Sequence, residues 1–493
     1  MASSPDRRAL LAIGAAAATA AMLAFGFALD PVSWLMWIAP LPLLLAVPRL
    51  GFWPAFLAAE AAWLAGTSRL WWYFADRLEM PLAFVLVSAA VFTLMYTAAT
   101  LLYRALVRRG RLGLAFLAMP SGAVAVEYLG SVINADAGGQ WWSLAYTQAD
   151  HPAVLQLVSV TGIWGLTFLL TAVPTAAALM AAPGAARRQR IGIAVAAASC
   201  LAATLAYGTL RPVDQGEHIR AAALALPTDQ DSIPVGTAKA DALLADYEAA
   251  ITGLAGDGID VLVLSEKIFH VTAAEAGPHL DQWSALAAAT GIDLVLGLAV
   301  DTEQGTYNTA VWIPADGTAT AEYRKQHLVV GLEDWMTAGT AGPTAVSGTD
   351  EQWALTICKD LDHTATIAEY GDAGTGLVLA PALDFAVDGW WHSRIAHTRA
   401  VEQGFSLVRA GQLGLMTVTD ASGTVLAEDD RLAVADVPTG HVDTLYGRFG
   451  DWFLIPVLAM LLLGIAGSIP RRRQDPAPEE AAQPRTPEPA TAG

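Results

Sequence analysis

Eight apolar segments, most of them long enough to cross a lipid bilayer, constrain this sequence more than any other feature. A helix needs roughly 20 mostly apolar residues to cross the hydrocarbon core. The second segment is short and contains Pro40 and Pro42, so we expect an irregular helix there, which neighbouring helices can accommodate. Arg7 and Arg8 precede the first segment as in a signal peptide, but its length and the seven further segments favour an uncleaved helix. The expected spans are residues 9–29, 33–48, 51–74, 81–103, 112–133, 154–182, 191–210 and 452–469.

Charge divides the 493-residue chain, whose net charge is −19. Residues 1–211 hold 13 Lys/Arg and 8 Asp/Glu, whereas residues 212–450 hold 11 Lys/Arg and 34 Asp/Glu. We therefore expect four parts: a membrane domain of seven transmembrane helices (1–211), an acidic globular domain (212–450), a C-terminal transmembrane helix (451–470) and a disordered cytoplasmic tail (471–493). The acidic balance argues against a nucleic-acid partner. With only Cys200 and Cys358, the chain can form neither a disulfide scaffold nor a multi-cysteine metal site.

Basic residues predict the sidedness of the chain. Cytoplasmic loops carry an excess of Lys and Arg, and in an eight-span arrangement every basic cluster falls on one face of the membrane. We therefore expect both termini to be cytoplasmic and the acidic domain, which follows span seven, to lie on the outer face. The clusters are Arg7–Arg8, Arg49, Arg104–Arg111, Arg187–Arg190 and Arg471–Arg473.

The acidic domain alternates short β-type runs with helical patterns, which is typical of a layered α/β fold. A turn-rich connection joins 292–298 to 308–313, so we expect these two strands to pair antiparallel. We expect helices at 237–255, 280–290 and 389–403. The expected strands are 219–225, 259–264, 292–298, 308–313, 353–357, 376–380, 405–409 and 414–419.

Three residues of this domain could together carry out acyl transfer. Glu266 lies just past an apolar strand, Lys325 is one of only four lysines, and Cys358 closes the run WALTI. A thiolate can attack an ester or amide carbonyl to give a thioester, a carboxylate can take and return the thiol proton, and an ammonium can stabilise the oxyanion. Taken singly, each of these residues is better explained by a structural role.

At these positions the chain resembles the nitrilase superfamily, whose members use a Glu–Lys–Cys triad, and over its length it resembles the apolipoprotein N-acyltransferase family. The similar stretches occur in the same order in both. They are WLMWIAPLPLLLAV (34–47), the segment 141–170, YNTAVW (307–312), YRKQHLVVGLE (323–333), TICKD (356–360) and the segment 392–414.

The resemblance implies a multi-pass membrane bundle joined to an extracytoplasmic nitrilase-like α-β-β-α sandwich in a bacterial inner membrane. It implies that Cys358 takes an acyl chain from a phospholipid as a thioester and passes it to the amine of a diacylglyceryl-cysteine lipoprotein. Glu266 would be the base, Lys325 the oxyanion group and Glu333 a supporting carboxylate. It implies no cofactor and no metal, and it leaves the oligomeric state open.

Around the triad the sequence departs from the family pattern. Lys359 and Asp360 stand where the family usually has Tyr-Glu, and these neighbours shape the substrate pockets. Lys359 could lower the pKa of the thiol, or it could point away into a salt bridge with Asp360 or Asp362. His392 could shuttle protons, or it could serve packing alone. The ionisable residues Glu60, Arg69 and Glu127, within or near the spans, could form a polar lining under the site.

Three functions remain open on sequence alone. The first is lipoprotein N-acylation with a phospholipid donor. The second is a membrane-tethered amidase, or an acyltransferase with another amine acceptor, that uses the same triad. The third is a non-catalytic paralogue that binds lipid or a partner protein, although such a protein has no need to keep Glu266, Lys325 and Cys358 together.

Overall fold

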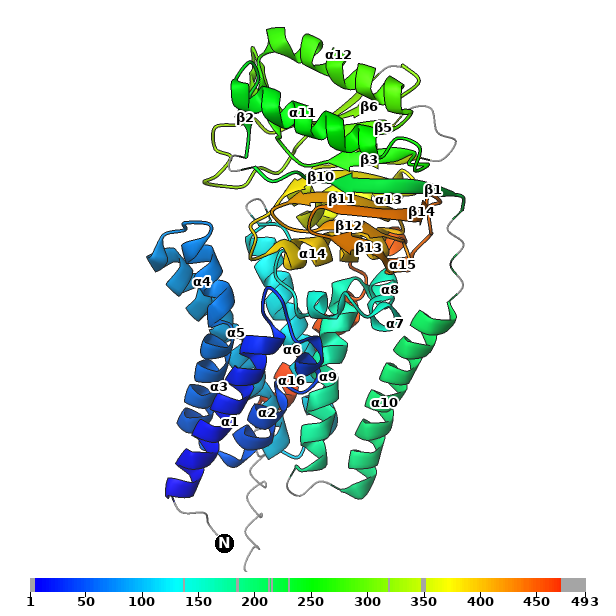
Figure 1. Ribbon diagram of the computed structural model, residues 1–493. Helices are drawn as coiled ribbons and strands as arrows, with labels where there is room; N and C mark the ends of the chain where they lie inside the picture. The colour runs from blue at the N-terminus through cyan, green and yellow to red at the C-terminus, as the bar shows by residue number, and fades with distance from the viewer. Residues whose placement is uncertain are drawn as a thin grey trace, which may run out of the picture.

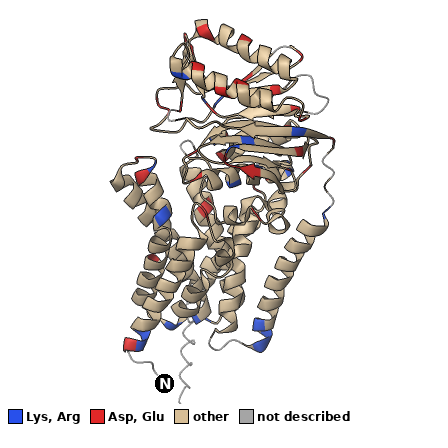
Figure 2. Cartoon of the chain, in the orientation of Figure 1, with Lys and Arg blue, Asp and Glu red and all other residues tan. Residues whose placement is uncertain are grey.

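The computed structural model describes residues 5–135, 138–182, 186–211, 213, 216–228, 231–317, 320–346 and 352–470. A bundle of helices forms its lower part and an α/β domain its upper part (Figure 1). Charged residues gather on the α/β domain and at the lower ends of the helices, while the middle of the bundle carries few (Figure 2). The expected tail 471–493, with Arg471–Arg473, lies outside the described residues.

Five helices in the described residues are long and apolar enough to cross a membrane. Each coincides with one of the eight expected spans, and long apolar helices need neighbours or lipid to cover them. They are α1 (Pro5–Gly26), α5 (Leu82–Arg108), α6 (Leu112–Ile133), α9 (Ile163–Met180) and α10 (Arg187–Leu210).

The other three expected spans form shorter apolar helices. The second span is broken, as its prolines predict, into η1 (Ser33–Trp37), α2 (Leu41–Ala46) and η2 (Val47–Arg49). The third is not one helix to residue 74, because α3 (Phe52–Gly66) ends before Thr67 and α4 (Ser68–Asp76) follows at once. The last is α16 (Leu454–Ser468).

The expected helix over 154–182 is wrong in its first turns. Two four-residue helices, α7 (Pro152–Leu155) and α8 (Val158–Thr161), precede α9. Gly162 separates them from α9 because it takes a φ of +62°, which glycine adopts far more readily than other residues. A Cβ at Gly162 would also lie 2.4 Å from the ring of Tyr446. The turn therefore needs glycine both for its positive φ and for the space beside Tyr446.

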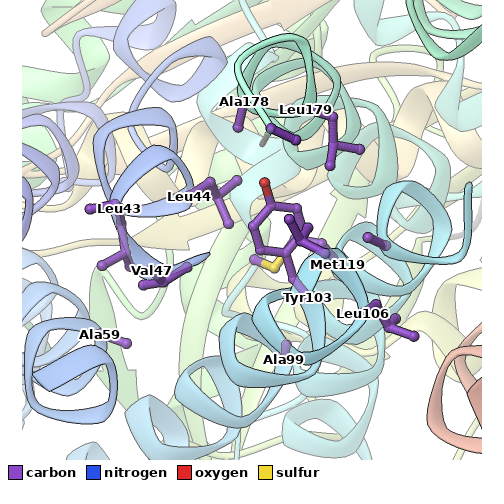
Figure 3. Close-up of a cluster of buried hydrophobic side chains, with 14 of the residues drawn as sticks. Leu43, Leu44, Val47, Ala59, Ala99, Tyr103, Leu106, Met119, Ala178 and Leu179 are labelled. Carbon is purple, nitrogen blue, oxygen red and sulfur yellow. The ribbon is translucent and has the colours of Figure 1, made fainter. Parts of the chain in front are cut away.

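Small and large apolar side chains interlock in the core of the bundle. Tyr103 and Leu106 of α5 lie beside Leu44 of α2, Met119 of α6 and Leu179 of α9 (Figure 3). All five are almost fully buried. The broken second span is therefore part of the bundle's interior, which explains how its irregular backbone is accommodated.

Two β-sheets form the centre of the α/β domain. The first has the strand order β14-β1-β3-β5-β4-β2, with β6 paired to β5 and β7 to β6; the second has the order β13-β12-β11-β10-β9-β8. The strands are β1 (His218–Leu224), β2 (Ile233–Pro234), β3 (Val261–Leu264), β4 (Phe269–Val271), β5 (Asp293–Thr302), β6 (Gly305–Ile313), β7 (Ala321–Arg324), β8 (Thr344–Ala345), β9 (Trp353–Leu355), β10 (Leu377–Leu383), β11 (Ser406–Gln412), β12 (Met416–Thr419), β13 (Val425–Asp429) and β14 (Leu432–Pro438).

Helices cover the outer faces of the two sheets. Buried residues of both sheets, among them Val263 and Leu379, form one cluster between the sheets. Tyr247 and Trp283, from the helices on the first sheet, form a cluster with its outer face. The layers therefore run helix, sheet, sheet, helix (Figure 1), which agrees with the expected sandwich. The helices are α11 (Ala238–Gly253) and α12 (Ala273–Thr290) on the first sheet, and α13 (Thr364–Asp372) and α14 (Gly389–Gln403) on the second.

All eight expected strands and all three expected helices are present, with ends that differ by a few residues. The expected antiparallel pair is confirmed, since β5 pairs with β6 in that sense. Strands β2, β4, β7, β8, β13 and β14 were not expected. Of these, β14 pairs antiparallel with β1 at one edge of the first sheet, and β2 and β8 are only two residues long.

Buried polar contacts from α14 fix the α/β domain to the bundle. The Glu402 carboxylate accepts a hydrogen bond of 2.9 Å from the backbone N–H of Ile163, one of the N–H groups that α9 cannot satisfy internally. Arg399 pairs with Glu402 and donates to the hydroxyl of Tyr146 at 2.5 Å. The two parts are thus joined by groups that would be costly to bury unpaired.

Candidate active site

Glu266 lies just past β3, where a close approach of the backbone fixes its position. A Cβ at Gly297 of β5 would lie 2.3 Å from the carbonyl oxygen of Ser265 and 2.7 Å from the Cα of Glu266. Only glycine therefore lets β5 pass so near. The next residue, Lys267, has a φ of +51°, a conformation that is uncommon for residues with side chains and concentrates at functional sites.

The Lys325 ammonium joins two buried carboxylates. Lys325 follows β7, and its Nζ donates hydrogen bonds of 2.8 Å to Oε1 of Glu266 and 2.8 Å to Oε2 of Glu333. All three side chains are almost fully buried. The structure therefore brings together three of the residues singled out in the sequence: Glu266, Lys325 and Glu333.

Two further residues complete this group of charges. Asn308 of β6 donates from Nδ2 to Oε1 of Glu266 at 2.5 Å and to Oε1 of Glu333 at 3.1 Å. Lys267 donates to Oε1 of Glu333 at 2.8 Å. Neither Asn308 nor Lys267 was expected at the site from the sequence. Asn308 lies within the stretch YNTAVW, and Lys267 directly follows Glu266 and is one of only four lysines, so both signals were present.

Cys358 opens a short 3-10 helix, η4 (Cys358–Asp362), and does not close a strand. β9 ends at Leu355, and Cys358 has a φ of +44°, which a strand cannot continue. The expected strand 353–357 is therefore two residues too long, and Cys358 does not directly follow the strand. Its Sγ lies 3.6 Å from the carbonyl oxygen of Leu383, to which the thiol donates. The positive φ stores strain at the reactive residue.

Electrostatics keep the Cys358 thiol protonated in the resting protein. Burial raises its pKa well above the usual value, and the neighbouring Glu266 carboxylate raises it further, against a smaller opposite effect of Lys325. Burial alone would lower the pKa of Lys325, but Glu266 and Glu333 outweigh it, and the pKa is raised. The two lysines in turn hold the pKa of Glu333 below its usual range despite burial. The ammonium is therefore charged while the thiol is neutral.

One carboxylate oxygen of Glu266 has no hydrogen-bond partner among the described residues. Oε1 accepts from Lys325 and Asn308, whereas Oε2 is buried without a hydrogen-bond partner among the described residues. A buried carboxylate oxygen without a donor is costly. The arrangement provides a proton acceptor beside a neutral thiol.

Asp360 has a positioning role. Its carboxylate accepts from the hydroxyl of Tyr323 at 2.7 Å and from the backbone N–H of His327 at 2.8 Å and of Gln326 at 3.2 Å. Burial raises its pKa to about 7. Asp360 thus ties η4, which begins at Cys358, to the segment that immediately follows Lys325.

Lys359 lies on the wall of the same cavity as Cys358. Within the described residues it forms no ion pair within 4 Å. The expected alternative of a salt bridge with Asp360 or Asp362 is therefore wrong. Asp360 is already occupied by Tyr323 and two backbone N–H groups.

His392 belongs to a second buried network and does not touch the Lys325 group. Its Nδ1 lies 3.2 Å from Asp384, which also forms a two-point ion pair with Arg409 at 2.9 and 2.5 Å. Burial alone would lower the pKa of His392, but Asp388 and Asp384 outweigh it and raise the pKa to about 9. The indole N–H of Trp141 points at Nε2 from 3.0 Å and favours the neutral ring instead. The two carboxylates affect the pKa of His392 more strongly than the contact with Trp141 does, so the ring is mainly protonated.

Asp384, Asp388 and His392 are also the group in the described residues whose ligand atoms lie close enough to hold a metal ion, all within 4.8 Å of one another. Their lone pairs are engaged, however. Arg409 takes both oxygens of Asp384, and the hydroxyl of Tyr73 and the backbone N–H of Phe385 take those of Asp388. The group is better suited to holding Arg409 and the bundle residue Tyr73 in place.

A cavity of about 1000 Å³ reaches from this site into the bundle. Membrane-side aromatic and aliphatic groups line one end, and the charged residues line the other. Of the three ionisable residues expected to form a polar lining, Glu127 of α6 lies on its wall and accepts from the backbone N–H of Leu144 at 2.9 Å. Glu60 and Arg69 are not among the described residues that line it. The apolar end is lined by Trp71, Phe84, Val87, Val91 and Met95, and the polar end by Glu266, Lys325 and Cys358.

Comparison with known proteins matches both parts of the chain. Residues 19–176 match the family model of the apolipoprotein N-acyltransferase N-terminal domain, and residues 220–441 match that of the carbon-nitrogen hydrolases. The apolipoprotein N-acyltransferase of Haemophilus ducreyi is 25% identical over 66% of this chain and 70% of its own length. That of Brucella melitensis is 27% identical over 87% of this chain and 86% of its own length.

Among solved structures, an amidase from Nesterenkonia sp. is 22% identical, with a TM-score of 0.41, and the match covers 50% of this chain and 97% of the amidase.

The protonated thiol gives a prediction for Cys358. Because burial and Glu266 raise its pKa, we expect iodoacetamide to alkylate it at pH 7 at least about ten-fold more slowly than a free cysteine, whose pKa is about 8.5. The rate should still be rising above pH 9. Intact-mass analysis of the Cys200→Ser protein, with N-acetylcysteine amide as reference, measures both. A rate that levels off below pH 8 would show a thiolate in the resting protein and contradict this description.

Proposed function

The chain belongs to the apolipoprotein N-acyltransferase family within the carbon-nitrogen hydrolase superfamily, and from this we propose that it transfers a fatty acyl chain from a membrane phospholipid to the N-terminal amine of a diacylglyceryl-cysteine lipoprotein. The observation that carries the proposal is the single cavity that runs from the apolar surface of α5 to the Cys358 thiol. Both substrates are anchored in the membrane, and such a cavity can receive an acyl chain at one end while its ester reaches the thiol at the other.

In the first half-reaction, Cys358 attacks the ester carbonyl and Oε2 of Glu266 takes the thiol proton. An ammonium has three donors, and in the described residues Lys325 uses two of them on Glu266 and Glu333. The third stabilises the tetrahedral oxyanion. When the intermediate collapses, the C–O bond breaks and Glu266 returns the proton to the departing lysophospholipid oxygen. The acyl chain remains on Cys358 as a thioester.

In the second half-reaction, the lipoprotein amine, after losing its ammonium proton to solvent, attacks the thioester carbonyl and gives up a second proton to Glu266. Lys325 again stabilises the oxyanion. The C–S bond breaks, the amide product leaves, and the proton on Glu266 returns to the Cys358 sulfur. This chemistry needs neither a cofactor nor a metal, because the three side chains supply the nucleophile, the base and the oxyanion donor.

We also propose the arrangement in the membrane. The eight apolar segments cross the inner membrane, both termini are cytoplasmic, and residues 212–450 form the catalytic domain on the outer face. Basic residues at the end of the bundle away from the α/β domain support this orientation (Figure 2). There Arg49 donates to the carbonyl of Ala181 at 2.9 Å, Arg104 to that of Leu50 at 2.9 Å, and Arg111 to that of Gly467 at 2.5 Å, so the ends of five helical segments, η2, α5, α6, α9 and α16, meet at one basic face.

The acyl-enzyme is the most direct test. Purified protein incubated with phosphatidylglycerol should gain the mass of one acyl chain, which hydroxylamine should remove, and the gain should be lost in Cys358→Ala. Cys200→Ala is the matched control and should behave as wild type. Subsequent addition of a diacylglyceryl lipopeptide should discharge the enzyme and yield the N-acylated lipopeptide. A Cys358→Ala protein that still acylates the lipopeptide would refute the proposal, and discharge at the same rate without lipopeptide would indicate a hydrolase of the lipid ester instead.

The cavity predicts a dependence on chain length. Ser88 of α5 lines the cavity, so Ser88→Trp should obstruct the acyl chain and lower the rate of thioester formation from a long-chain phosphatidylglycerol at least about ten-fold. A short substrate, p-nitrophenyl acetate, should be affected less than about two-fold. Leu86→Trp places the same bulk on an exposed position of α5 and serves as control. Equal loss with both substrates would show that the cavity does not receive the chain.

Orientation can be measured with single cysteines in a Cys200→Ser, Cys358→Ser protein. Asp257 is exposed on the α/β domain, and Arg109 is exposed between α5 and α6. A membrane-impermeant maleimide added to intact spheroplasts should label Asp257→Cys and leave Arg109→Cys unlabelled until the cells are lysed. The reverse pattern would invert the proposed topology.

A further inference from the structure

Five basic side chains line the cavity: Lys267, Lys325, Lys359, His392 and Arg409. Three of the chain's four lysines are among them. Four of the five face a carboxylate within the structure. Lys267 lies 2.8 Å from Glu333, Lys325 2.8 Å from Glu266 and Glu333, His392 3.2 Å from Asp384, and Arg409 2.5 Å from Asp384.

Lys359 is the exception. Among the described residues, no carboxylate lies within 4 Å of its Nζ and no hydrogen bond is formed there. Asp360 is engaged by Tyr323 and the backbone of residues 326 and 327. The charge of Asp362 raises the pKa of Lys359, but its carboxylate forms no ion pair with Nζ within 4 Å and offsets only part of the effect of burial. A charge in a partly buried site without a partner is costly, and burial lowers the pKa of Lys359 accordingly. An anion supplied by a ligand would remove this cost.

We propose that Lys359 binds the phosphate of the phospholipid that donates the acyl chain. This inference rests on the proposed function. Lys359 directly follows the nucleophile, and the Cα atoms of consecutive residues are about 3.8 Å apart. In a glycerophospholipid the ester carbonyl and the phosphate are separated only by the glycerol carbons, so one lipid can present its carbonyl to Cys358 and its phosphate to Lys359.

The assignment makes Lys359 a specificity residue for one half-reaction. The phosphate is present on the donor and absent from the diacylglyceryl-cysteine acceptor, whose amine is itself a cation. Lys359 should therefore strengthen binding of the donor and contribute nothing to binding of the acceptor. It also gives the enzyme a means of choosing phospholipid over diacylglycerol, which carries the same acyl esters without a phosphate.

The test compares two donors with identical acyl chains, phosphatidylglycerol and diacylglycerol, in detergent micelles. Wild type should form the Cys358 thioester more efficiently from phosphatidylglycerol. In Lys359→Met we expect the KM for phosphatidylglycerol to rise at least about ten-fold, while kcat, the rate with diacylglycerol and the KM for a lipopeptide acceptor stay within about two-fold. Lys359→Arg should recover most of the phospholipid preference. Lys239→Met, on exposed α11, removes the same charge elsewhere and should match wild type.

Acylation by p-nitrophenyl acetate shows whether the variant is folded and its thiol still reactive; Lys359→Gln, with a polar side chain, replaces Lys359→Met should that variant fail to fold. Equal loss with both donors, or a shifted pH profile with p-nitrophenyl acetate, would mean that Lys359 acts on the thiol and would overturn the inference. An unchanged preference for phosphatidylglycerol would overturn it as well. In either case wild type still forms its thioester and the proposed function stands, whereas a wild type that forms no thioester from any lipid would overturn both.

Discussion

The site depends on a buried group of charges, and burying any one of these charges without the others would be unfavourable. Lys325 lies between Glu266 and Glu333, and Lys267 and Asn308 complete their hydrogen bonds. Removing an ion from water costs several kcal/mol even after relaxation, so two ammonium groups and two carboxylates must be brought together before any can be buried. They come from the ends of different strands and from the segment that follows β7. The charged residues of the site can therefore meet only when the strands of the first sheet are in place.

Two members of this group each keep one hydrogen-bonding position that is not used within the structure. In the described residues, Glu266 retains one unpartnered oxygen and Lys325 retains one of its three protons. Both groups act on the Cys358 thiol, whose pKa Glu266 raises and Lys325 lowers. In the proposed mechanism the first accepts a proton and the second stabilises negative charge. A protonated thiol is less open to oxidation and alkylation, which require the thiolate.

Much of this could be predicted from the sequence, and the failures have physical causes. Apolar runs and alternating patterns indicated the long helices and all eight expected strands, because burial dictates them directly. Strands such as β2 and β8 have two residues each, too few to produce a pattern. Gly162 separates α8 from α9 and Cys358 begins η4, both with positive φ values, and a single residue type does not reveal such a turn. The hydrogen-bond partners were the other feature that the sequence did not predict. Asn308 and Lys267 donate to Glu333 through contacts between strands of the sheet. His392 contacts Asp384, and not the group around Lys325, because of the direction in which α14 faces.

Exclusion of water decides whether such a site transfers an acyl group or hydrolyses it. A thioester is open to attack by water as well as by an amine, and an acyltransferase must preserve it until the second substrate arrives. Here η4 is covered by the bundle: the backbone N–H of Gln140 donates to the carbonyl of Asp362 at 2.7 Å, and a Cβ at Gly139 would lie 2.6 Å from that oxygen. With Cys358 buried and the cavity leading into apolar side chains of α5, the acyl chain itself would occupy the route by which water could approach. Glu402 and Arg399 hold the α/β domain on the bundle. These contacts help to keep water from the thioester, because the bundle forms a wall of the cavity that a soluble hydrolase would lack.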